Sequence, residues 1–349
     1  MHKYHGNPII TPDMIPPSDK RLMVKGALNP GAVQLGKETL LLLRVAEGCI
    51  QTPGTVSIPT YEFTSSQPSL RVLHLSRSDP RVQIKDSRAV LVGDKEYVST
   101  ISHLRLARSS NGIDFKIDAK PFWMPVNPSE EFGVEDARIT KIDDTYFINY
   151  TAVSGDSYGT SLLRTTDFKN VEYLGMIFSA PNKDVCIFPE KISGSYVALH
   201  RPFNHGFGKS SIWIAKSPDL IHWGQHQCLL RPGATLWESE KIGGGAPPIK
   251  TERGWLVIYH GKSLQGRADY YCLMVMLLDI NDPSKIIYQG EQPILFPSAS
   301  YETKGFVPNV VFLNGVVQTS DDSLLLYYSA CDEVTCLAQC TIDDLIPQS

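Results

Sequence analysis

The 349-residue sequence lacks the features that would place it in a membrane or on a nucleic acid. No stretch supplies the roughly 18 consecutive apolar residues of a spanning helix, and the N-terminal segment, MHKYHGNPIITPDMIPPSDK, has no apolar signal-peptide core. The formal net charge is −4 and the pI is about 6.1, so there is no global basic field for sequence-independent nucleic-acid binding. We therefore expect a cytoplasmic protein with no membrane or nucleic-acid partner, in which recognition of phosphate or sugar is local.

Several catalytic motifs are also missing. The sequence has no GxSxG elbow, no HExxH and no DxDxDG loop, which argues against serine hydrolases, metalloproteases and this type of calcium site. The glycine run at 243–245 is not followed by GK[ST], which argues against a nucleotide P-loop. The seven cysteines are scattered, without CxxC pairs or the histidine spacing of a zinc site, and are expected to be reduced structural thiols.

Helical periodicity is nearly absent from the sequence. Short runs rich in β-formers are separated by Gly, Pro, Asn and Asp throughout, which predicts an all-β chain. With 349 residues, 42% of them hydrophobic, the chain is either two ordinary domains or one large repetitive domain.

One type of strand recurs five times, beginning at a turn residue and ending in polar groups. Its copies lie at 38–47, 144–152, 194–202, 254–261 and 322–332. A second strand type follows four of these copies, at 160–168, 210–223, 271–280 and 334–345, whereas the partner of the first copy, at 102–115, is delayed by an insertion around 50–100. The sequence therefore contains five copies of a two-strand unit.

Five such units favour a single five-bladed β-propeller domain spanning 1–349, because a radial array of small antiparallel sheets protects the strand edges. Two β-sandwiches are the alternative. In a propeller the innermost strands line a channel, and we expect the recurring strand to be innermost, with its polar ends meeting at one mouth. Those ends carry Arg44, Asn149, His200, Arg201, Tyr259, His260 and Asp332.

The segment FGVEDARI, at 132–139, offers a first candidate for catalysis. Adjacent residues of a strand point to opposite faces, so only one of Glu135 and Asp136 is expected to face a site, with Arg138 on the same side as Asp136. A structural ion pair is the alternative interpretation.

Two further segments gather basic residues. Lys183, His200 and Arg201 lie within twenty residues of one another, and such clusters suit a tetrahedral oxyanion such as phosphate, although solvated surface charges would look the same. Lys241 precedes the glycine run and His260 ends the next strand, so both could face one ligand approached closely by glycine backbone.

The motifs taken together resemble glycoside hydrolase family 130, the mannoside phosphorylases and β-1,2-mannosidases. The matching segments, in the family's order, are LNPGAV (28–33), SHLRLARS (102–109), VEDARIT (134–140), KDVCIFPEKI (183–192), LHRP (199–202), IGGGAPPI (242–249), WLVIYHG (255–261) and YYSACDEVTCLA (327–338). The resemblance implies a five-bladed propeller and makes Asp136 the catalytic acid, which would protonate the glycosidic oxygen through the 3-hydroxyl of the bound mannosyl unit. Phosphate would attack the anomeric carbon from the opposite face and give α-mannose 1-phosphate.

The resemblance also implies ligand contacts. The positions that match the family's phosphate site are Arg44, Lys183, Arg201, Lys241 and His260. The positions assigned to the sugar are Asn29, Ser102, His103, Arg105, Glu135, Arg138, His200, Tyr259, Phe306, Asn309 and Asp332. No metal or organic cofactor is implied, because the reaction requires only an acid, a nucleophile and positioned hydrogen bonds.

We therefore expect inverting phosphorolysis of β-1,2-mannobiose or short β-1,2-mannooligosaccharides, with a small sugar and phosphate as partners and a homo-oligomer allowed. An inverting β-1,2-mannosidase is the alternative, for which Glu190, Glu238 or Glu240 would supply the base. A non-catalytic sugar-binding propeller is the alternative from another class.

Overall fold

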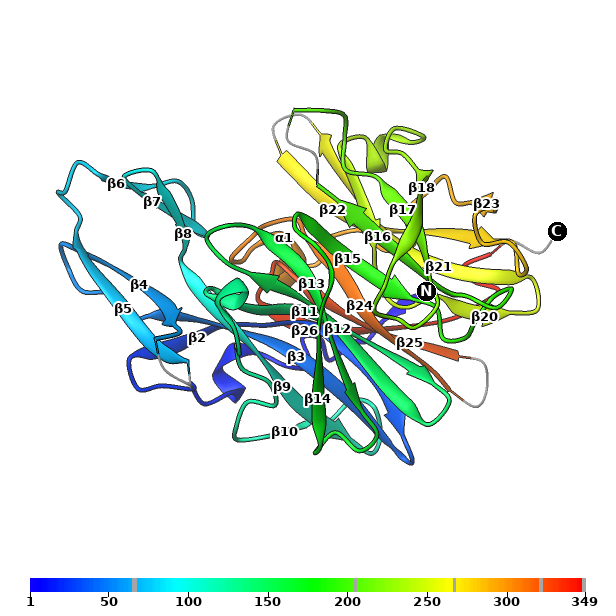
Figure 1. Cartoon of the computed structure of the whole chain (residues 1–349), viewed down its shortest axis with the longest axis horizontal. Helices are drawn as coiled ribbons and strands as arrows, with labels where there is room; N and C mark the ends of the chain where they lie inside the picture. Colours follow the sequence, from blue (N-terminus) through cyan, green and yellow to red (C-terminus); the bar gives the residue numbers. More distant parts are fainter. Residues whose placement is uncertain (65–67, 204–205, 266–267, 320–322, 347–349) are drawn as a thin grey trace.

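The computed structural model describes residues 1–64, 68–203, 206–265, 268–319 and 323–346 (Figure 1). As predicted, this part of the chain is all-β. Apart from the strands it contains one short α-helix and three 3₁₀ turns: α1 (Ser300–Thr303), η1 (Pro12–Met14), η2 (Pro128–Glu130) and η3 (Leu236–Glu238). None of the helices in the described ranges has the length and apolar character needed to cross a membrane.

The largest sheet consists of two antiparallel four-stranded groups. The first group contains β2 (Leu22–Leu35), β3 (Glu38–Cys49), β9 (Thr100–Ser109) and β10 (Lys116–Ile117). The second contains β11 (Gly133–Ile142), β12 (Thr145–Val153), β13 (Tyr158–Thr165) and β14 (Val171–Phe178). A single parallel pairing, Gly133 with Ser102, joins the two groups.

Three further sheets complete the body of the molecule. One contains β15 (Asn182–Ile187), β16 (Tyr196–Pro202), β17 (Ile212–Ser217) and β18 (Gly224–Leu230). The next contains β19 (Lys241–Gly244), β20 (Ile249–Thr251), β21 (Gly254–Gln265), β22 (Ala268–Leu278) and β23 (Ile286–Gln289). The last contains β1 (His2–Lys3), β24 (Val311–Gln318), β25 (Ser323–Ala330) and β26 (Val334–Thr341). Because β1 pairs with β26, the two ends of the chain meet in one sheet.

The predicted two-strand repeat is present five times. The recurring strand corresponds to β3, β12, β16, β21 and β25, and its antiparallel partners are β9, β13, β17, β22 and β26. These strands are continuously apolar rather than alternating, because they are covered on both faces. All four leucines at 40–43 are 0% exposed, for example.

The expectation that the recurring strand is innermost is wrong. The strands that meet one another are β2, β11, β15, β19 and β24, each of which precedes the recurring strand. Side-chain hydrogen bonds cross between these strands, from Asn29 of β2 to Asp136 of β11 and from Arg138 of β11 to Asp184 of β15. The recurring strand has a neighbour on both edges, whereas the strand before it forms the edge of its antiparallel group and so faces the middle.

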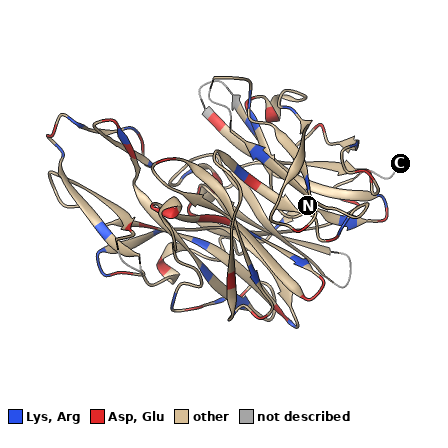
Figure 2. Ribbon diagram, viewed as in Figure 1, with Lys and Arg blue, Asp and Glu red and all other residues tan. Residues whose placement is uncertain are grey.

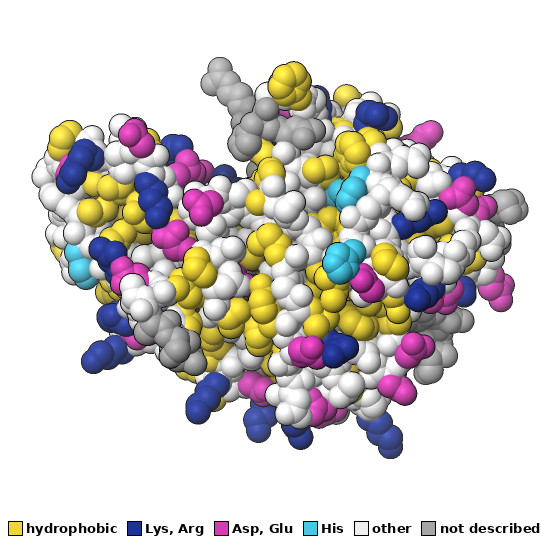
Figure 3. Space-filling view, viewed as in Figure 1, with side chains coloured by type: hydrophobic (Ala, Val, Ile, Leu, Met, Phe, Trp, Pro, Cys, Tyr) yellow, Lys and Arg dark blue, Asp and Glu magenta, His cyan; other side chains and the backbone are white. Residues whose placement is uncertain are grey.

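The insertion around 50–100 forms two small sheets. They are β4 (Thr55–Glu62) with β5 (Ser69–Ser76), and β6 (Val82–Ile84) with β7 (Ala89–Val92) and β8 (Lys95–Val98). These strands, residues 55–98, form what we call the arm, which projects from the body in Figure 1 and is a lobe of its own in Figure 3. The arm has a small core of Val56, Ile58 and Val90.

Basic and acidic residues are interspersed along the ribbon, so neither sign of charge dominates (Figure 2). All seven cysteines lie in the described ranges as free thiols, and six of them are buried, as expected of structural thiols.

Candidate active site

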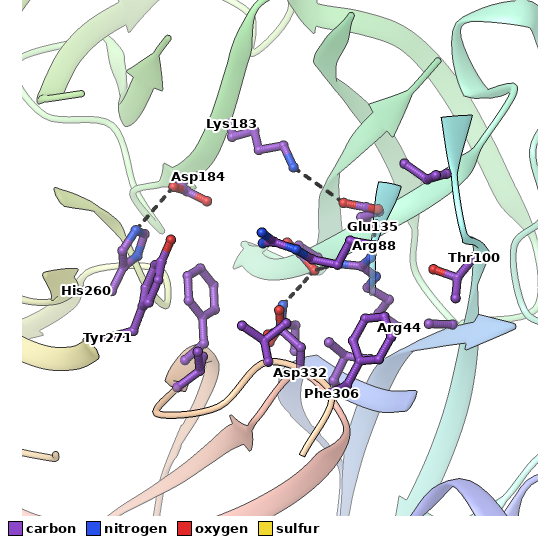
Figure 4. A pocket seen from close by; sticks show the side chains of 18 of the residues that line it. Arg44, Arg88, Thr100, Glu135, Lys183, Asp184, His260, Tyr271, Phe306 and Asp332 are labelled. Atoms are coloured by element: carbon purple, nitrogen blue, oxygen red, sulfur yellow. Dashed lines mark hydrogen bonds and ion pairs between the residues drawn. The ribbon is translucent and has the colours of Figure 1, made fainter. Parts of the chain in front are cut away.

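A pocket of about 260 Å³ opens where the edge strands meet (Figure 4). Its walls come from β2, β3, β9, β11, β15, β16, β19, β21, β22 and β24, from the segment before β24, from Asp332 after β25, and from the arm. The charged and polar residues that line it are Lys25, Asn29, Arg44, Arg88, Thr100, Glu135, Asp136, Lys183, Asp184, Arg201, Lys241, His260, Tyr271 and Asp332.

Glu135 and Asp136 both face the pocket, contrary to the prediction that only one of them would. The register of β11 against β12 shifts between Glu135 and Arg138, and Asp136 has a φ of 55°. This bulge breaks the two-residue alternation, so adjacent side chains point the same way. Arg138, expected beside the Asp136 carboxylate, instead lies beneath it and donates to the Asp136 carbonyl oxygen at 3.2 Å.

The same irregularity recurs in two other edge strands. The register of β2 shifts between Leu28 and Gly31, and that of β15 shifts between Lys183 and Cys186. Within these bulges Asn29 and Asp184 have φ values of 43° and 55°, in the left-handed region that Asn and Asp tolerate better than most residues. Three bulges thus direct three polar side chains toward the pocket.

Asp136 is buried within a network of donors. Asn29 Nδ2 donates to its Oδ1 at 2.8 Å, and Arg44 Nη1 donates to the same oxygen at 3.1 Å. Burial alone would raise the pKa of Asp136, but the charges of Arg44 and Lys183 and the Asn29 hydrogen bond outweigh it and leave the pKa lowered. The carboxylate is therefore held ionised in the free protein.

Arg44 forms ion pairs with both carboxylates, Glu135 and Asp136. Its Nη2 donates to Glu135 at 2.8 Å and its Nε donates to Ser102 Oγ at 3.0 Å, in addition to the bond with Asp136. Figure 4 shows Arg44 and Glu135 on the side of the pocket away from His260. The other four predicted phosphate ligands also line the pocket, and one of them, Lys183, lies with its Nζ 3.4 Å from the second oxygen of Glu135.

These four residues, Lys183, Arg201, Lys241 and His260, form what we call the basic wall. Burial lowers the pKa of Lys241 to about 7, with a further contribution from the Arg201 charge, and its Nζ donates to Tyr271 Oη at 2.6 Å. Burial also lowers the pKa of His260 to about 3, so its ring is neutral at pH 7. The wall offers several donors around one space, which suits a tetrahedral anion.

Asp184 anchors the basic wall and was not identified from the sequence. It accepts from Arg201 Nε at 2.6 Å and from Arg138 Nη2 at 3.3 Å, and it lies 3.7 Å from His260 Nε2. Burial opposes its ionisation, but the charges of Arg201 and Arg138 keep its pKa well below the usual value. The only sequence signal was the dipeptide Lys183-Asp184, which parallels Glu135-Asp136 in its own bulge.

Asp332 and Phe306, two of the residues assigned to the sugar, line the pocket. Asp332 has a φ of 53°, and burial raises its pKa although Arg44 and Arg88 oppose the shift. Asn309 is outside the lining. Its φ is 62° and its carbonyl oxygen accepts from the Tyr271 amide at 3.0 Å, so it holds the backbone of a pocket residue.

Six other predicted sugar-binding residues lie behind the lining. Ser102 supports Arg44, His103 lies 3.4 Å from Glu47, and Arg105 donates to the Pro16 carbonyl oxygen. The other three are Arg138, which bonds Asp184, His200, which bonds Asn182 and His226, and Tyr259, which donates to Glu238.

The glutamates considered as hydrolytic bases are also outside the lining. Glu190 pairs with Lys250, Glu240 pairs with Lys209, and Glu238 accepts from Tyr259 at 2.7 Å. Within the described ranges there is no group of three or more His, Cys, Asp or Glu residues arranged to hold a metal ion.

The chain matches known carbohydrate-active proteins. The sequence model of the family described as beta-1,4-mannooligosaccharide phosphorylase, glycoside hydrolase family 130, matches residues 79–348. A beta-1,2-mannobiose phosphorylase from Listeria innocua is 43% identical over 347 residues, which cover 97% of this chain and 95% of the relative. A 1,2-beta-oligomannan phosphorylase from Thermoanaerobacter is 39% identical, covering 72% of this chain and 82% of the relative.

Comparison with solved structures also identifies similar proteins. The beta-1,2-mannobiose complex of the Listeria innocua phosphorylase superposes with a TM-score of 0.93 at 40% identity, covering 99% of this chain and 97% of that one. A putative glycoside hydrolase from Parabacteroides distasonis superposes with a TM-score of 0.74 at 22% identity, covering 97% and 95%, and shares the fold.

Proposed function

Because the chain belongs to glycoside hydrolase family 130, we propose that it is an inverting glycoside phosphorylase that converts β-1,2-mannobiose or short β-1,2-mannooligosaccharides to α-mannose 1-phosphate and the shortened sugar. One observation carries the proposal. The buried acid Asp136 shares a single pocket with the basic wall, whose Lys183, Arg201, Lys241 and His260 suit a phosphate nucleophile. The naming of the similar proteins as β-1,2-mannobiose and β-1,2-oligomannan phosphorylases supports this choice of linkage.

The mannosyl unit to be transferred would lie between Asp136 and the basic wall, with Asp332 binding its hydroxyls. Phosphate on the basic wall attacks the anomeric carbon, and the bond to the leaving sugar breaks as the phosphate bond forms. Asp136, which is ionised in the free protein, would take up a proton when the sugar and phosphate bind and pass it to the departing oxygen through the 3-hydroxyl of the mannosyl unit. Arg44 holds Glu135 and Asp136 in place, since its three nitrogens are engaged with them and with Ser102.

Hydrolysis by the same fold would require a carboxylate base to activate water across the sugar from the acid. Glu190, Glu238 and Glu240 are bonded elsewhere and do not line the pocket. Asp184 does line it, but its oxygens accept from Arg201 and Arg138. The arrangement therefore favours phosphate as the nucleophile.

The test is to incubate the purified protein with β-1,2-mannobiose, with and without inorganic phosphate, and to quantify mannose and mannose 1-phosphate. We expect mannose 1-phosphate to form only with phosphate, in the α configuration by proton NMR. Release of mannose alone, at a rate indifferent to phosphate, would make the protein a hydrolase, and turnover in neither condition would favour a sugar-binding protein.

We also propose that the five antiparallel groups are the blades of one five-bladed β-propeller domain spanning 1–349, with the arm inserted into the first blade. The convergence of β2, β11, β15, β19 and β24 supports this arrangement. The pairing of β1 with β26 would fasten the last blade with the N-terminal strand.

A further inference from the structure

Arg88 lies on the arm, yet it lines the same pocket as Asp136 and Asp332. Figure 4 shows its side chain pointing toward the centre of the pocket. Its charge acts on both Asp332 and Tyr271 across the pocket. The arm therefore delivers a cation to a site otherwise built from the body of the molecule.

The structure holds Arg88 in place from several directions. Its amide and its Nη2 donate to the two oxygens of Asp86, at 2.7 and 3.1 Å, and its carbonyl oxygen accepts from the Ser99 amide at 2.7 Å. The neighbouring Ser87 Oγ donates to the Phe306 carbonyl oxygen at 3.3 Å, which ties the arm to the rim of the pocket. This part of the arm is thus hydrogen-bonded to the rim, while the Arg88 side chain is 58% exposed and paired with Asp86.

The guanidinium retains donors for a ligand. Among the described residues, no hydrogen bond engages Nε or Nη1 of Arg88. A guanidinium group offers several N–H donors in a planar fork and has no acceptor, so hydroxyl oxygens of a sugar are suitable partners. The arm and the adjoining strand also place Val98 and Thr100 in the lining, which gives this end both apolar and hydroxyl surface.

The basic wall enters the pocket from other elements than Arg88 does. It is built from β15, β16, β19 and β21, whereas Arg88 precedes β7 of the arm. In a single displacement the nucleophile and the leaving group lie on opposite sides of the anomeric carbon. With phosphate on the basic wall, the leaving sugar lies toward the arm.

We propose that Arg88 is a specificity-determining residue that binds hydroxyls of the sugar released in phosphorolysis, which is the acceptor in the reverse reaction. This inference rests on the proposed phosphorylase function. It assigns the arm a role in selecting the acceptor, while the body of the molecule performs the bond exchange.

The test uses the synthetic direction, with α-mannose 1-phosphate as donor and mannose as acceptor. We expect R88A to raise the KM for mannose about tenfold, as loss of a hydrogen bond from a charged donor would, and to leave the KM for mannose 1-phosphate within about twofold of wild type. R88K keeps the charge but not the planar fork of donors, so its KM for mannose should lie between those of wild type and R88A. Arg81 is the matched control, because it makes the same pair with Asp79 on the same arm but does not line the pocket, so R81A should leave both KM values unchanged.

The proposal would be overturned if R88A raised the KM for phosphate or mannose 1-phosphate instead, since Arg88 would then bind the phosphoryl group. An R88A enzyme with unchanged KM for every substrate would overturn it too. Failure of the underlying function is a separate outcome, because the wild-type protein would then form no mannose 1-phosphate from mannobiose and phosphate.

Discussion

The side-chain amide of Asn29 donates to Asp136 Oδ1 at 2.8 Å, and both residues have left-handed backbone. The two strands that carry them, β2 and β11, belong to different antiparallel groups of the sheet. Asn29 in turn accepts from Ser329 Oγ of β25. The proposed acid is thus positioned by strands from three parts of the sequence, and its properties can be tested by substitution.

Replacing Asp136 with Asn keeps the shape and an oxygen that can accept from Asn29, but it removes the transferable proton. We expect kcat for phosphorolysis to fall by roughly 10²- to 10⁴-fold, the usual contribution of a general acid. Binding of β-1,2-mannobiose, measured by calorimetry, should persist. The control is E240Q, because Glu240 is exposed and paired with Lys209 away from the pocket, and it should retain the wild-type rate. A D136N protein with unchanged turnover would exclude Asp136 as the acid.

Phosphate affinity should depend on pH through Lys241. Since burial lowers its pKa to about 7, the free protein loses this positive charge as the pH rises through that value. Phosphate is bound by the charged form, so the KM for phosphate should rise above pH 7, by up to about tenfold per pH unit. K241R stays charged throughout this range and should show a flatter profile. Phosphate's own ionisation affects both proteins equally, and parallel profiles would count against a role for the Lys241 charge.

Lys241 should also make stability depend on pH. As the pH rises, stability should increase, whereas the affinity for phosphate should decrease. Its pKa is lower in the folded protein than the ordinary value of 10.5, so the unfolded chain binds more protons between pH 7 and about 10. The contribution of Lys241 to the free energy of unfolding should therefore increase with pH across this window. Urea denaturation of wild type and K241M at pH 6 and pH 9 measures it. K241M should be more stable than wild type by a larger margin at pH 6, and an equal margin at both values would contradict the lowered pKa.

Asp184 neutralises Arg138 and Arg201 in the interior. Removal of one member of a buried ion pair leaves the other charge without compensation, at a cost of about 3–5 kcal/mol. We expect D184N to lower the free energy of unfolding by about this amount in urea denaturation and to raise the KM for phosphate by misplacing Arg201. D118N is the control, because the Asp118 side chain is 44% exposed and lies 3.9 Å from Arg108, and it should change stability by less than about 0.5 kcal/mol. A D184N protein as stable as D118N would contradict the anchoring role.

Gly243 allows the basic wall to pack closely. A Cβ at this position would collide with Asp184 Oδ2 and lie 2.5 Å from His260 Cε1. We expect G243A to displace both groups and to lower kcat/KM about hundredfold, as misplacement by about 1 Å does. At Gly224 a Cβ would have no neighbour within 4 Å, so G224A should keep wild-type activity. Equal activity of the two variants would mean that the close approach is not required.

The sequence alone determined the all-β class and the five copies of the two-strand unit, and it suggested the chemistry of the proposed ligand. Turn residues between short apolar runs define strands locally, and Lys183, Arg201, Lys241 and His260 can be recognised by type and by their motifs. These features depend on near neighbours in the chain, which is why they can be predicted without knowing the fold. The proposed acid could be selected by resemblance to the family, since Asp136 lies in a distinctive segment.

Tertiary structure decided which strands face the pocket and how. One extra residue in β11 overrides the alternation of a strand and turns Glu135 and Asp136 to the same side, and the pattern of residue types does not reveal such a bulge. The anchoring role of Asp184 depends on guanidinium groups from β11 and β16, which only folding brings together. Arg88 enters the pocket because the arm folds back onto the rim. Each of these contacts joins segments far apart in the chain, so its energy depends on three-dimensional packing rather than on local sequence.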